Sequence, residues 1–265
     1  MTNLLKRSTS GLVYAVLFIG AILYSKESYI ILIAIFGLAS IWEFSKIIQL
    51  KNVIPYIFFG AFIVLPFLDF DIEAAMPILL FVALTGSVQM IFHLYSKSNT
   101  YPSTFVQRLD TALRYIVFSF GILILLPIQE GVYQESIVLS LVLFIWTNDS
   151  FAYLVGKNFG KRKLLEKVSP KKTIEGFVGG IVFTVIVGIV ISYYFEILSL
   201  EQWIVLSLMT SILGTIGDLV ESKFKRQAKV KDSGNIMPGH GGLLDRLDSL
   251  LFVAPFVYLY IHYLI

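Results

Sequence analysis

The sequence predicts an all-α, polytopic integral membrane protein, a bundle of about nine transmembrane helices with a cytoplasmic N-terminus. Three observations predict this class: an apolar composition, a series of apolar segments of spanning length, and a one-sided distribution of basic residues. Of the 265 residues, 57% are apolar and 15% are charged, whereas soluble domains are about 45–50% apolar and about 25% charged. The chain has no cysteine, which excludes disulfides, thiolate metal sites and a cysteine nucleophile.

Nine apolar segments follow one another along the chain. A helix needs about 20 apolar residues to cross a bilayer, and most of the segments approach this length. The first follows two basic residues, as a signal peptide would, but no small-residue cleavage site follows it, so we expect a retained helix. The segments are 9–25, 28–48, 53–70, 74–95, 110–128, 135–156, 175–197, 201–222 and 246–265.

The loop charges predict the orientation of the bundle. If the N-terminus and the even-numbered loops share one side, all but one of the 21 basic residues lie there, Lys6 and Arg7 included, and Lys26 alone lies opposite. Basic loops remain in the cytoplasm, so we expect a cytoplasmic N-terminus and cytoplasmic loops at 156–175 and 222–246. The opposite loops carry acids: Glu27, Asp69, Asp71, Glu73, Glu130, Glu135, Glu196 and Glu201.

The chemistry is concentrated in the second half of the chain. We divide the chain into residues 1–135, a scaffold of transmembrane helices that could also carry dimer contacts, and residues 136–265, a catalytic region with the two cytoplasmic loops. In the first half, Trp42-Glu43-Phe44 is interpreted as an interfacial anchor. In the second half, small residues recur at every fourth position of segment 175–197, which is typical of close helix packing within the bundle or at a dimer contact. These are Gly176, Gly180, Thr184, Gly188 and Ser192.

Acidic residues recur near the cytoplasmic ends of three helices. An aspartate at membrane depth costs about 2.5–3.5 kcal/mol on insertion scales, so Asp149 should face a partner or a wet cavity. Segment 201–222 carries a polar face that includes Asp218 and lies next to Glu221, and we expect this face to line a cavity open to the cytoplasm. Asp245 and Asp248 are spaced to share one helical face. The polar face consists of Ser211, Thr215, Asp218, Ser222 and Lys225.

Basic residues in both loops flank these acids. Ser169-Pro170-Lys171-Lys172 is interpreted as a helix start, with Ser169 as N-cap and Pro170 in the first turn. Two lysines in a first turn oppose the helix dipole, which favours a phosphate ligand there, whereas Lys161 to Lys163 are explained by the positive-inside rule. Carboxylates beside a basic phosphate cradle suit Mg²⁺-assisted phosphoryl or nucleotidyl transfer.

Three stretches of the sequence resemble a known family. S-K-F-K-R (222–226), K-D-S-G (231–234) and M-P-G-H-G-G-L-L-D-R-L-D (237–248) closely match the signature of the phosphatidate cytidylyltransferases, also called CDP-diglyceride synthetases. D-S-F-A-Y-L-V-G-K-x-F-G-K (149–161) and S-P-K-K-T-I-E-G (169–176) look like the same family. The resemblance covers at least residues 146–265, and Met237 is a conservative departure from the signature.

The resemblance implies a reaction and a cofactor. CTP and phosphatidate would give CDP-diacylglycerol and pyrophosphate. The cofactor would be Mg²⁺, with or without a second cation. The protein would lie in a bacterial inner membrane with its active site facing the cytoplasm. The resemblance is compatible with a homodimer, and no nucleic-acid partner is expected. Alternatives are nucleotidyl or phosphoryl transfer to another lipid phosphate or polyprenol, and an ion-coupled transporter, which is disfavoured because no internal repeat is visible.

Our hypothesis under this resemblance gives each polar residue a role. Asp218 and Asp245 anchor the metal, with Asp149, Glu221 and Asp248 as further ligands or outer contacts. Lys225, Arg226, Lys171 and Lys172 hold the triphosphate or the lipid phosphate. His240 positions a phosphate oxygen or, alternatively, stabilises the Pro238–Gly242 turn. The remaining substrate-binding candidates are Ser222, Lys231, Asp232 and Arg246.

Overall fold

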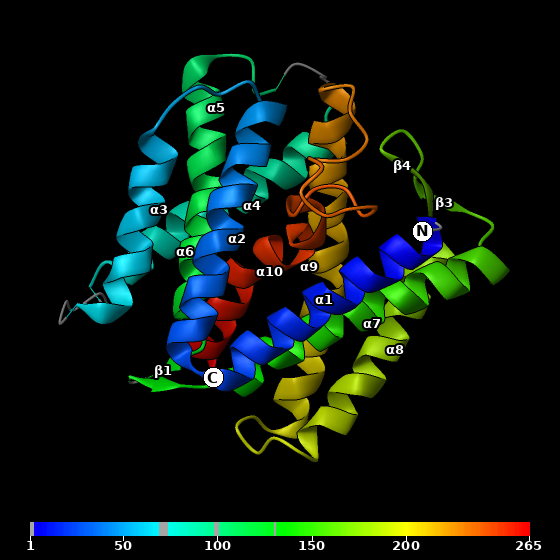
Figure 1. Ribbon diagram of the computed structural model, residues 1–265. Helices are drawn as coiled ribbons and strands as arrows, with labels where there is room; N and C mark the ends of the chain where they lie inside the picture. The colour runs from blue at the N-terminus through cyan, green and yellow to red at the C-terminus, as the bar shows by residue number, and fades with distance from the viewer. Residues whose placement is uncertain (1–2, 69–73, 98–100, 130) are drawn as a thin grey trace.

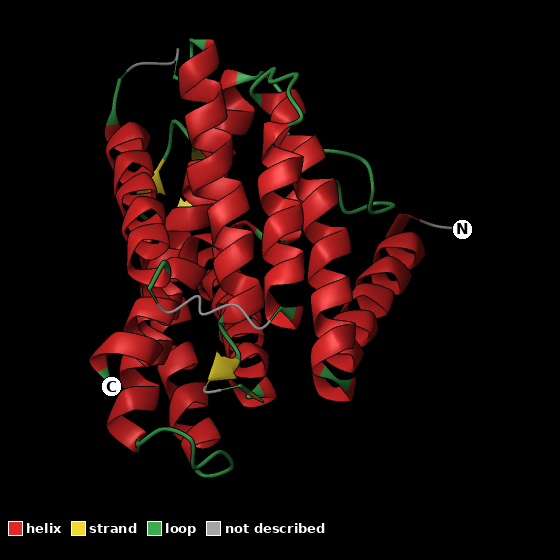
Figure 2. Ribbon diagram, turned by 90° about the vertical axis from the view of Figure 1, so that its left-hand side faces the viewer, coloured by secondary structure: helices red, strands yellow, loops and turns green. Residues whose placement is uncertain are grey.

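The computed structural model describes residues 3–68, 74–97, 101–129 and 131–265, without the side chains of residues 3–7. Its described part is nearly all helical, as predicted (Figures 1 and 2). The orientation argument also used acids and bases that fall outside the described residues or side chains: Lys6, Arg7, Asp69, Asp71, Glu73 and Glu130.

Ten α-helices make up most of the described chain. Short 3₁₀ and π segments extend several of them: η1 (Leu65–Phe67), η2 (Ala112–Val117), η3 (Leu244–Arg246) and η4 (Tyr260–Leu264). The α-helices are α1 (Asn3–Tyr24), α2 (Lys26–Ile47), α3 (Ile54–Val64), α4 (Met76–Tyr95), α5 (Phe105–Thr111), α6 (Phe118–Leu125), α7 (Glu135–Phe159), α8 (Ile174–Ser192), α9 (Leu200–Gln227) and α10 (Asp248–Leu259).

Five of the described helices are long and apolar enough to cross a membrane: α2, α4, α7, α8 and α9. The apolar runs Ser8–Tyr24 (within α1), Ile54–Phe67 (α3 and η1) and Asp248–Leu264 (α10 and η4) are shorter. Each of the nine predicted segments overlaps a helix or a series of helical pieces; residues 69 and 70 of segment 53–70 lie outside the described residues, and segment 110–128 overlaps α5, η2 and α6. Several helices begin where a side chain can accept from free backbone N–H groups, with capping boxes at Ser25, Thr104 and Ser199.

Two predicted boundaries in the functional half are wrong. The segment predicted to end at residue 222 continues to Gln227, so Lys225 and Arg226 lie on α9 rather than in a loop. Residues 169–172 do not start a helix: strand β4 (Ser169–Thr173) pairs antiparallel with β3 (Lys163–Leu165). Helix α8 begins only at Ile174, because the Thr173 hydroxyl accepts from the Gly176 N–H as the N-cap. A second small hairpin joins β1 (Ile128–Gln129) to β2 (Val132–Tyr133).

The small-residue stripe of α8 packs inside the bundle. A Cβ added at Gly180 would lie 2.5 Å from Oδ1 of Asn148 on α7, and one at Gly188 would lie 2.9 Å from the Ser207 side chain on α9. Helix α8 is therefore held closely by α7 on one side and α9 on the other. The stripe serves packing within one chain, which removes it as an argument for a dimer contact.

Candidate active site

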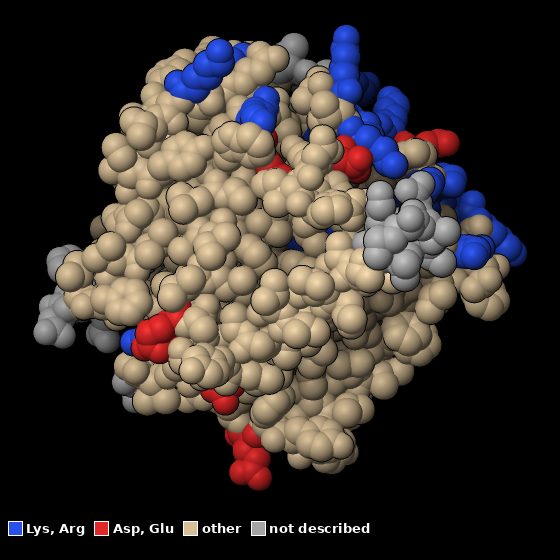
Figure 3. Space-filling view, in the orientation of Figure 1, with Lys and Arg blue, Asp and Glu red and all other residues tan. Residues whose placement is uncertain are grey.

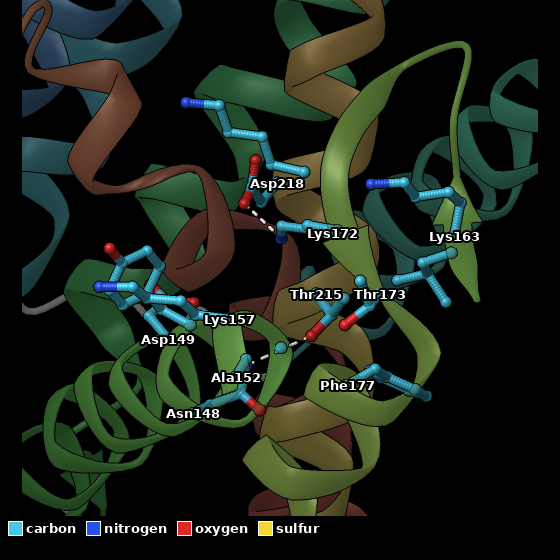
Figure 4. A pocket seen from close by; sticks show the side chains of 14 residues that line it. Asn148, Asp149, Ala152, Lys157, Lys163, Lys172, Thr173, Phe177, Thr215 and Asp218 are labelled. Carbon is cyan, nitrogen blue, oxygen red and sulfur yellow. Dashed lines mark hydrogen bonds and ion pairs between the residues drawn. The ribbon is translucent and has the colours of Figure 1, made fainter. Parts of the chain in front are cut away.

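A cavity of about 470 Å³ opens between α7, the β3–β4 hairpin, the start of α8 and α9 (Figure 4). Four lysines border it, and apolar side chains from α7, β3 and α8 complete its wall. The lining residues are Asn148, Asp149, Ala152, Tyr153, Gly156, Lys157, Lys163, Leu164, Lys171, Lys172, Thr173, Phe177, Thr215 and Asp218.

An ion pair joins the hairpin to α9 at this cavity. The Lys172 ammonium on β4 contacts the Asp218 carboxylate, and the Ser222 hydroxyl donates to the other oxygen of Asp218 at 3.1 Å. Burial opposes the charge on Lys172, but the carboxylates of Asp218 and Asp149 outweigh burial and hold the pKa of Lys172 above its ordinary value of 10.5. The hairpin thus presents a permanently charged amine to the cavity.

The floor of the cavity is polar. The Asn148 side chain on α7 donates through Nδ2 to the Thr215 hydroxyl on α9 at 3.2 Å. Oδ1 of Asn148 is buried and finds no hydrogen-bond partner within the described residues. Asp149, the next residue, interacts electrostatically with Lys172, Asp218 and Arg246. Asn148, Asp149 and Thr215 thus give this end of the cavity a polar lining.

A second charged cluster, whose side chains are more buried than Lys172 and Asp218, lies between α9 and the start of α10. The Lys225 ammonium bridges Glu221 and Asp245, at 2.5 Å from a carboxylate oxygen of each. Glu221 is fully buried, and it interacts with Asp248 as well as with Asp245. Asp245 and Asp248 therefore both lie near Glu221 of α9, but they do not share one helix as predicted, because Asp245 lies in η3 and Asp248 begins α10.

Backbone N–H groups of the α9–α10 loop fix Asp245. Its Oδ2 accepts from Ser233 N at 2.9 Å and from Gly242 N at 2.8 Å. Burial alone would raise the pKa of Asp245, but the Lys225 ammonium and these N–H donors outweigh burial and hold that pKa below its ordinary value of 3.8. Asp245 is therefore an ionised and rigidly oriented carboxylate at neutral pH.

The acids outnumber the amines that neutralise them. Among the described residues, Lys172 and Lys225 form ion pairs with Asp218, Glu221 and Asp245, while Asp149 and Asp248 have no ion pair within 4 Å. One Glu221 oxygen (Oε1) is buried without a hydrogen-bond donor among the described groups. Carboxylate oxygens and excess negative charge fit Mg²⁺. In the described part of the chain, no group of three metal-ligating side chains is arranged to hold a metal ion. Lys172 and Lys225 instead form ion pairs with Asp218, Glu221 and Asp245.

The other predicted site residues lie around this centre. Arg226 donates to the carbonyl oxygens of Val168, at 3.4 Å, and Val230, and so ties α9 to the hairpin. His240 contacts α1: its Nδ1 lies 2.7 Å from the Ser10 hydroxyl, and Arg246 donates to its carbonyl oxygen. Lys231 and Asp232 are exposed in the α9–α10 loop. Lys171 is exposed and lines the cavity. Of the predicted polar face of α9, Thr215 and Asp218 line the cavity, whereas Ser211 is buried outside that lining.

Sequence reasoning missed several residues. Lys163 was assigned to the positive-inside rule, and Lys157 received no role, yet both border the cavity. Asn148 was passed over beside Asp149. Glu43 was interpreted as an interfacial anchor, but it is fully buried and contacts the α9–α10 loop. The signal that could have found Glu43 is the one used for Asp149, an acid within an apolar segment.

The fold and the site together define a helical membrane protein with a lysine-bordered cavity beside a cluster of acids, of which Glu221 and Asp248 are buried. The chain belongs to the cytidylyltransferase family, whose model matches residues 5–264. This match covers nearly the whole chain and includes both halves of the bundle.

Curated relatives agree with this membership. The chain is 34% identical to a phosphatidate cytidylyltransferase of Bacillus subtilis over 97% of both chains. It is 48% identical to an enzyme of the same name from Staphylococcus aureus over 48% of each chain. A third relative of that name, from Staphylococcus epidermidis, is 37% identical over 80% of this chain and 69% of its own.

Proposed function

We propose that this protein transfers CMP from CTP to phosphatidate and so forms CDP-diacylglycerol and pyrophosphate. The observation that carries the proposal is the end-to-end similarity to a protein named for this activity. The site supports it independently, because the cavity joins cationic side chains that suit phosphates to apolar side chains that suit lipid.

The cavity wall fits an amphipathic substrate. Tyr153, an exposed residue of α7, and Phe177 of α8 line it together with Lys157, Lys171 and Lys172. A lipid phosphate would lie among the lysines while its acyl chains extend past the apolar side chains toward the bilayer. CTP would reach the same cationic border from the loop side.

The reaction needs no strong general base in the protein. A phosphate oxygen of phosphatidate attacks the α-phosphorus of CTP and forms the new P–O bond, while the bond from the α-phosphorus to the bridging oxygen breaks and pyrophosphate leaves with the electron pair. The attacking phosphate monoester is already largely ionised at neutral pH, since its second pKa is about 6. The lysines orient the phosphates and offset the charge that develops on them.

The acid cluster would hold Mg²⁺. Asp218 and Asp245 are its central members, with Asp149, Glu221 and Asp248 beside them. Bound there, the ion would act as a Lewis acid on the phosphoryl oxygens and offset the charge of the leaving pyrophosphate. Lys225 keeps Glu221 and Asp245 close together in this structure.

The proposed topology is nine spans with a cytoplasmic N-terminus and active site, in a bacterial inner membrane. On the face seen in Figure 3, most basic side chains gather at the end of the bundle that carries the hairpin and the α9–α10 loop, with some acidic ones among them, whereas the charged side chains at the opposite end are mainly acidic. This distribution supports a cytoplasmic active site. A homodimer remains a prediction.

Orientation has a direct test because the chain has no cysteine. Single variants Lys26→Cys and Lys51→Cys are exposed to a membrane-impermeant maleimide on intact cells and after permeabilisation. We expect Lys26→Cys to react in intact cells and Lys51→Cys only after permeabilisation. The reverse labelling pattern would show that the bundle has the opposite orientation in the membrane.

Activity is tested by pyrophosphate release from purified protein in detergent. Reactions contain CTP, phosphatidate and Mg²⁺, with controls that omit each component, add EDTA, or replace phosphatidate with a polyprenyl phosphate. We expect release only when all three components are present, with CDP-diacylglycerol as product. Folded protein that releases no pyrophosphate with phosphatidate, or that prefers the polyprenyl phosphate, would overturn the assignment.

A further inference from the structure

A buried carboxylate of the first half of the chain holds the loop that carries Asp245. Glu43, near the end of α2, is fully buried. Its Oε2 accepts from the Ser233 hydroxyl at 3.0 Å and from Leu244 N at 2.8 Å, and its Oε1 accepts from Leu243 N at 3.1 Å. One side chain thus binds both ends of the segment 233–244, across about 190–200 positions of sequence.

The same loop residues continue the connection to the acid cluster. Ser233 donates its hydroxyl to Glu43 and its backbone N–H to Asp245. Gly242, whose N–H donates to Asp245, directly precedes Leu243, whose N–H donates to Glu43. The carboxylates of Glu43 and Asp245 are therefore both bound by Ser233 and by the adjacent residues Gly242 and Leu243.

The loop approaches Glu43 so closely that only glycine fits at two positions. A Cβ at Gly234 would lie 2.2 Å from Oε1 of Glu43, and a Cβ at Gly242 would lie 2.6 Å from Oε2. These are the glycines that follow Ser233 and precede Leu243. Gly234 and Gly242 thus leave room for the Glu43 carboxylate and, at Gly242, for the Ser233 hydroxyl as well.

We propose that Glu43 is a positioning residue for the transfer reaction. It does not reach the substrate cavity; it fixes segment 233–244 so that Asp245 points at Lys225 and Glu221. The expected effect on turnover rests on the proposed function, whereas the anchoring of segment 233–244 by Glu43 does not. This anchoring also gives residues 1–135 a direct part in organising the active site, beyond the scaffold role predicted for them.

The structure suggests which substitution separates positioning from folding. In Glu43→Gln the side chain keeps its size, but one oxygen becomes an NH₂ group that faces a backbone or hydroxyl donor, so at least one bond to the loop is lost. Ser233→Ala removes a single bond to Glu43 and keeps the N–H to Asp245. Ser40→Ala is the matched control, since Ser40 lies one turn away on α2, is equally buried, and has no hydrogen-bond partner in the described structure.

The experiment measures amide hydrogen exchange in the ligand-free protein and, in parallel, kcat and KM for CTP. For Glu43→Gln we expect faster exchange confined to residues 233–246, and a fall in kcat of about 100-fold, the cost of a misplacement of about 1 Å at a reacting centre, with KM nearly unchanged. Ser233→Ala should shift both in the same direction by less, and the double variant should add little to Glu43→Gln. Ser40→Ala should match the wild type.

Two outcomes would overturn the proposal. One is exchange and kcat in Glu43→Gln equal to those of Ser40→Ala. The other is faster exchange throughout the bundle, which would make Glu43 a general folding residue. If the wild type itself lacks activity, the proposed function fails, while local exchange around residues 233–246 still decides whether Glu43 anchors the loop.

Discussion

Two lysines of α9, only two positions apart, make different contacts. Replacing Lys223 should lower the stability of the fold without changing turnover. Lys225 lies in the acid cluster, whereas Lys223 points to the end of α4. The Lys223 ammonium donates to the carbonyl oxygens of His93, of Leu94 at 3.3 Å and of Ser96 at 2.8 Å. Lys223→Met keeps the length of the side chain and removes these donors.

The size of the effect follows from these contacts. The last carbonyl groups of a helix have no partner within the helix, and a cation there also complements the helix dipole. Counting only the bonds to His93 and Ser96, at about 1.5 kcal/mol for each charge-assisted bond, gives a loss of about 3 kcal/mol in the free energy of unfolding. For a chain of this size that corresponds to a fall in Tm of roughly 6–12 °C.

Unfolding is followed in detergent by the fluorescence of the three tryptophans. Lys51→Met is the matched control: it removes the same charge from an exposed position, where the expected change is within about 0.5 kcal/mol. Turnover per folded molecule should be unchanged in both variants. A normal Tm for Lys223→Met, or a loss of turnover at normal Tm, would refute this reasoning.

Three further predictions concern the site and its support. Asp218→Asn should lower kcat by about 100-fold or more in the pyrophosphate assay while the protein stays folded, and Lys26→Ala on the far side should be silent; near-normal turnover of Asp218→Asn would remove its assigned role. Gly180→Leu should lower Tm by overlap with Asn148, a cost of about 1–3 kcal/mol; a changed oligomer mass by light scattering at unchanged Tm would instead point to a dimer contact. Asp245, whose pKa is held below 3.8, contributes stability that is present above pH 3.8 and lost as pH falls through its folded pKa. The difference in Tm between the wild type and Asp245→Asn should therefore be constant from pH 8 to 5, and a difference that already shrinks in that range would contradict the low pKa.

The sequence by itself determined the class of fold and the chemical character of the site. Apolar runs of spanning length leave few alternatives to helices, because backbone groups in a bilayer must be satisfied within their own segment. Acids such as Asp149 and Asp218 stand out for the same reason, since an unpaired charge there is costly. The family signature from Ser222 to Asp248 is a local pattern, readable without any three-dimensional information.

Only the tertiary structure decided how these residues divide their tasks. The strand at Ser169–Thr173 replaced a predicted helix start because pairing with β3 outweighed the local signal of Ser169 and Pro170. Lys223 and Lys225 look alike in sequence, and their different roles depend on which helix lies on each side of α9. Glu43 is nearly 200 positions from the loop it holds, and its role arises from packing α2 against the α9–α10 loop. Contacts between distant segments depend on the whole fold, and local propensity does not encode them.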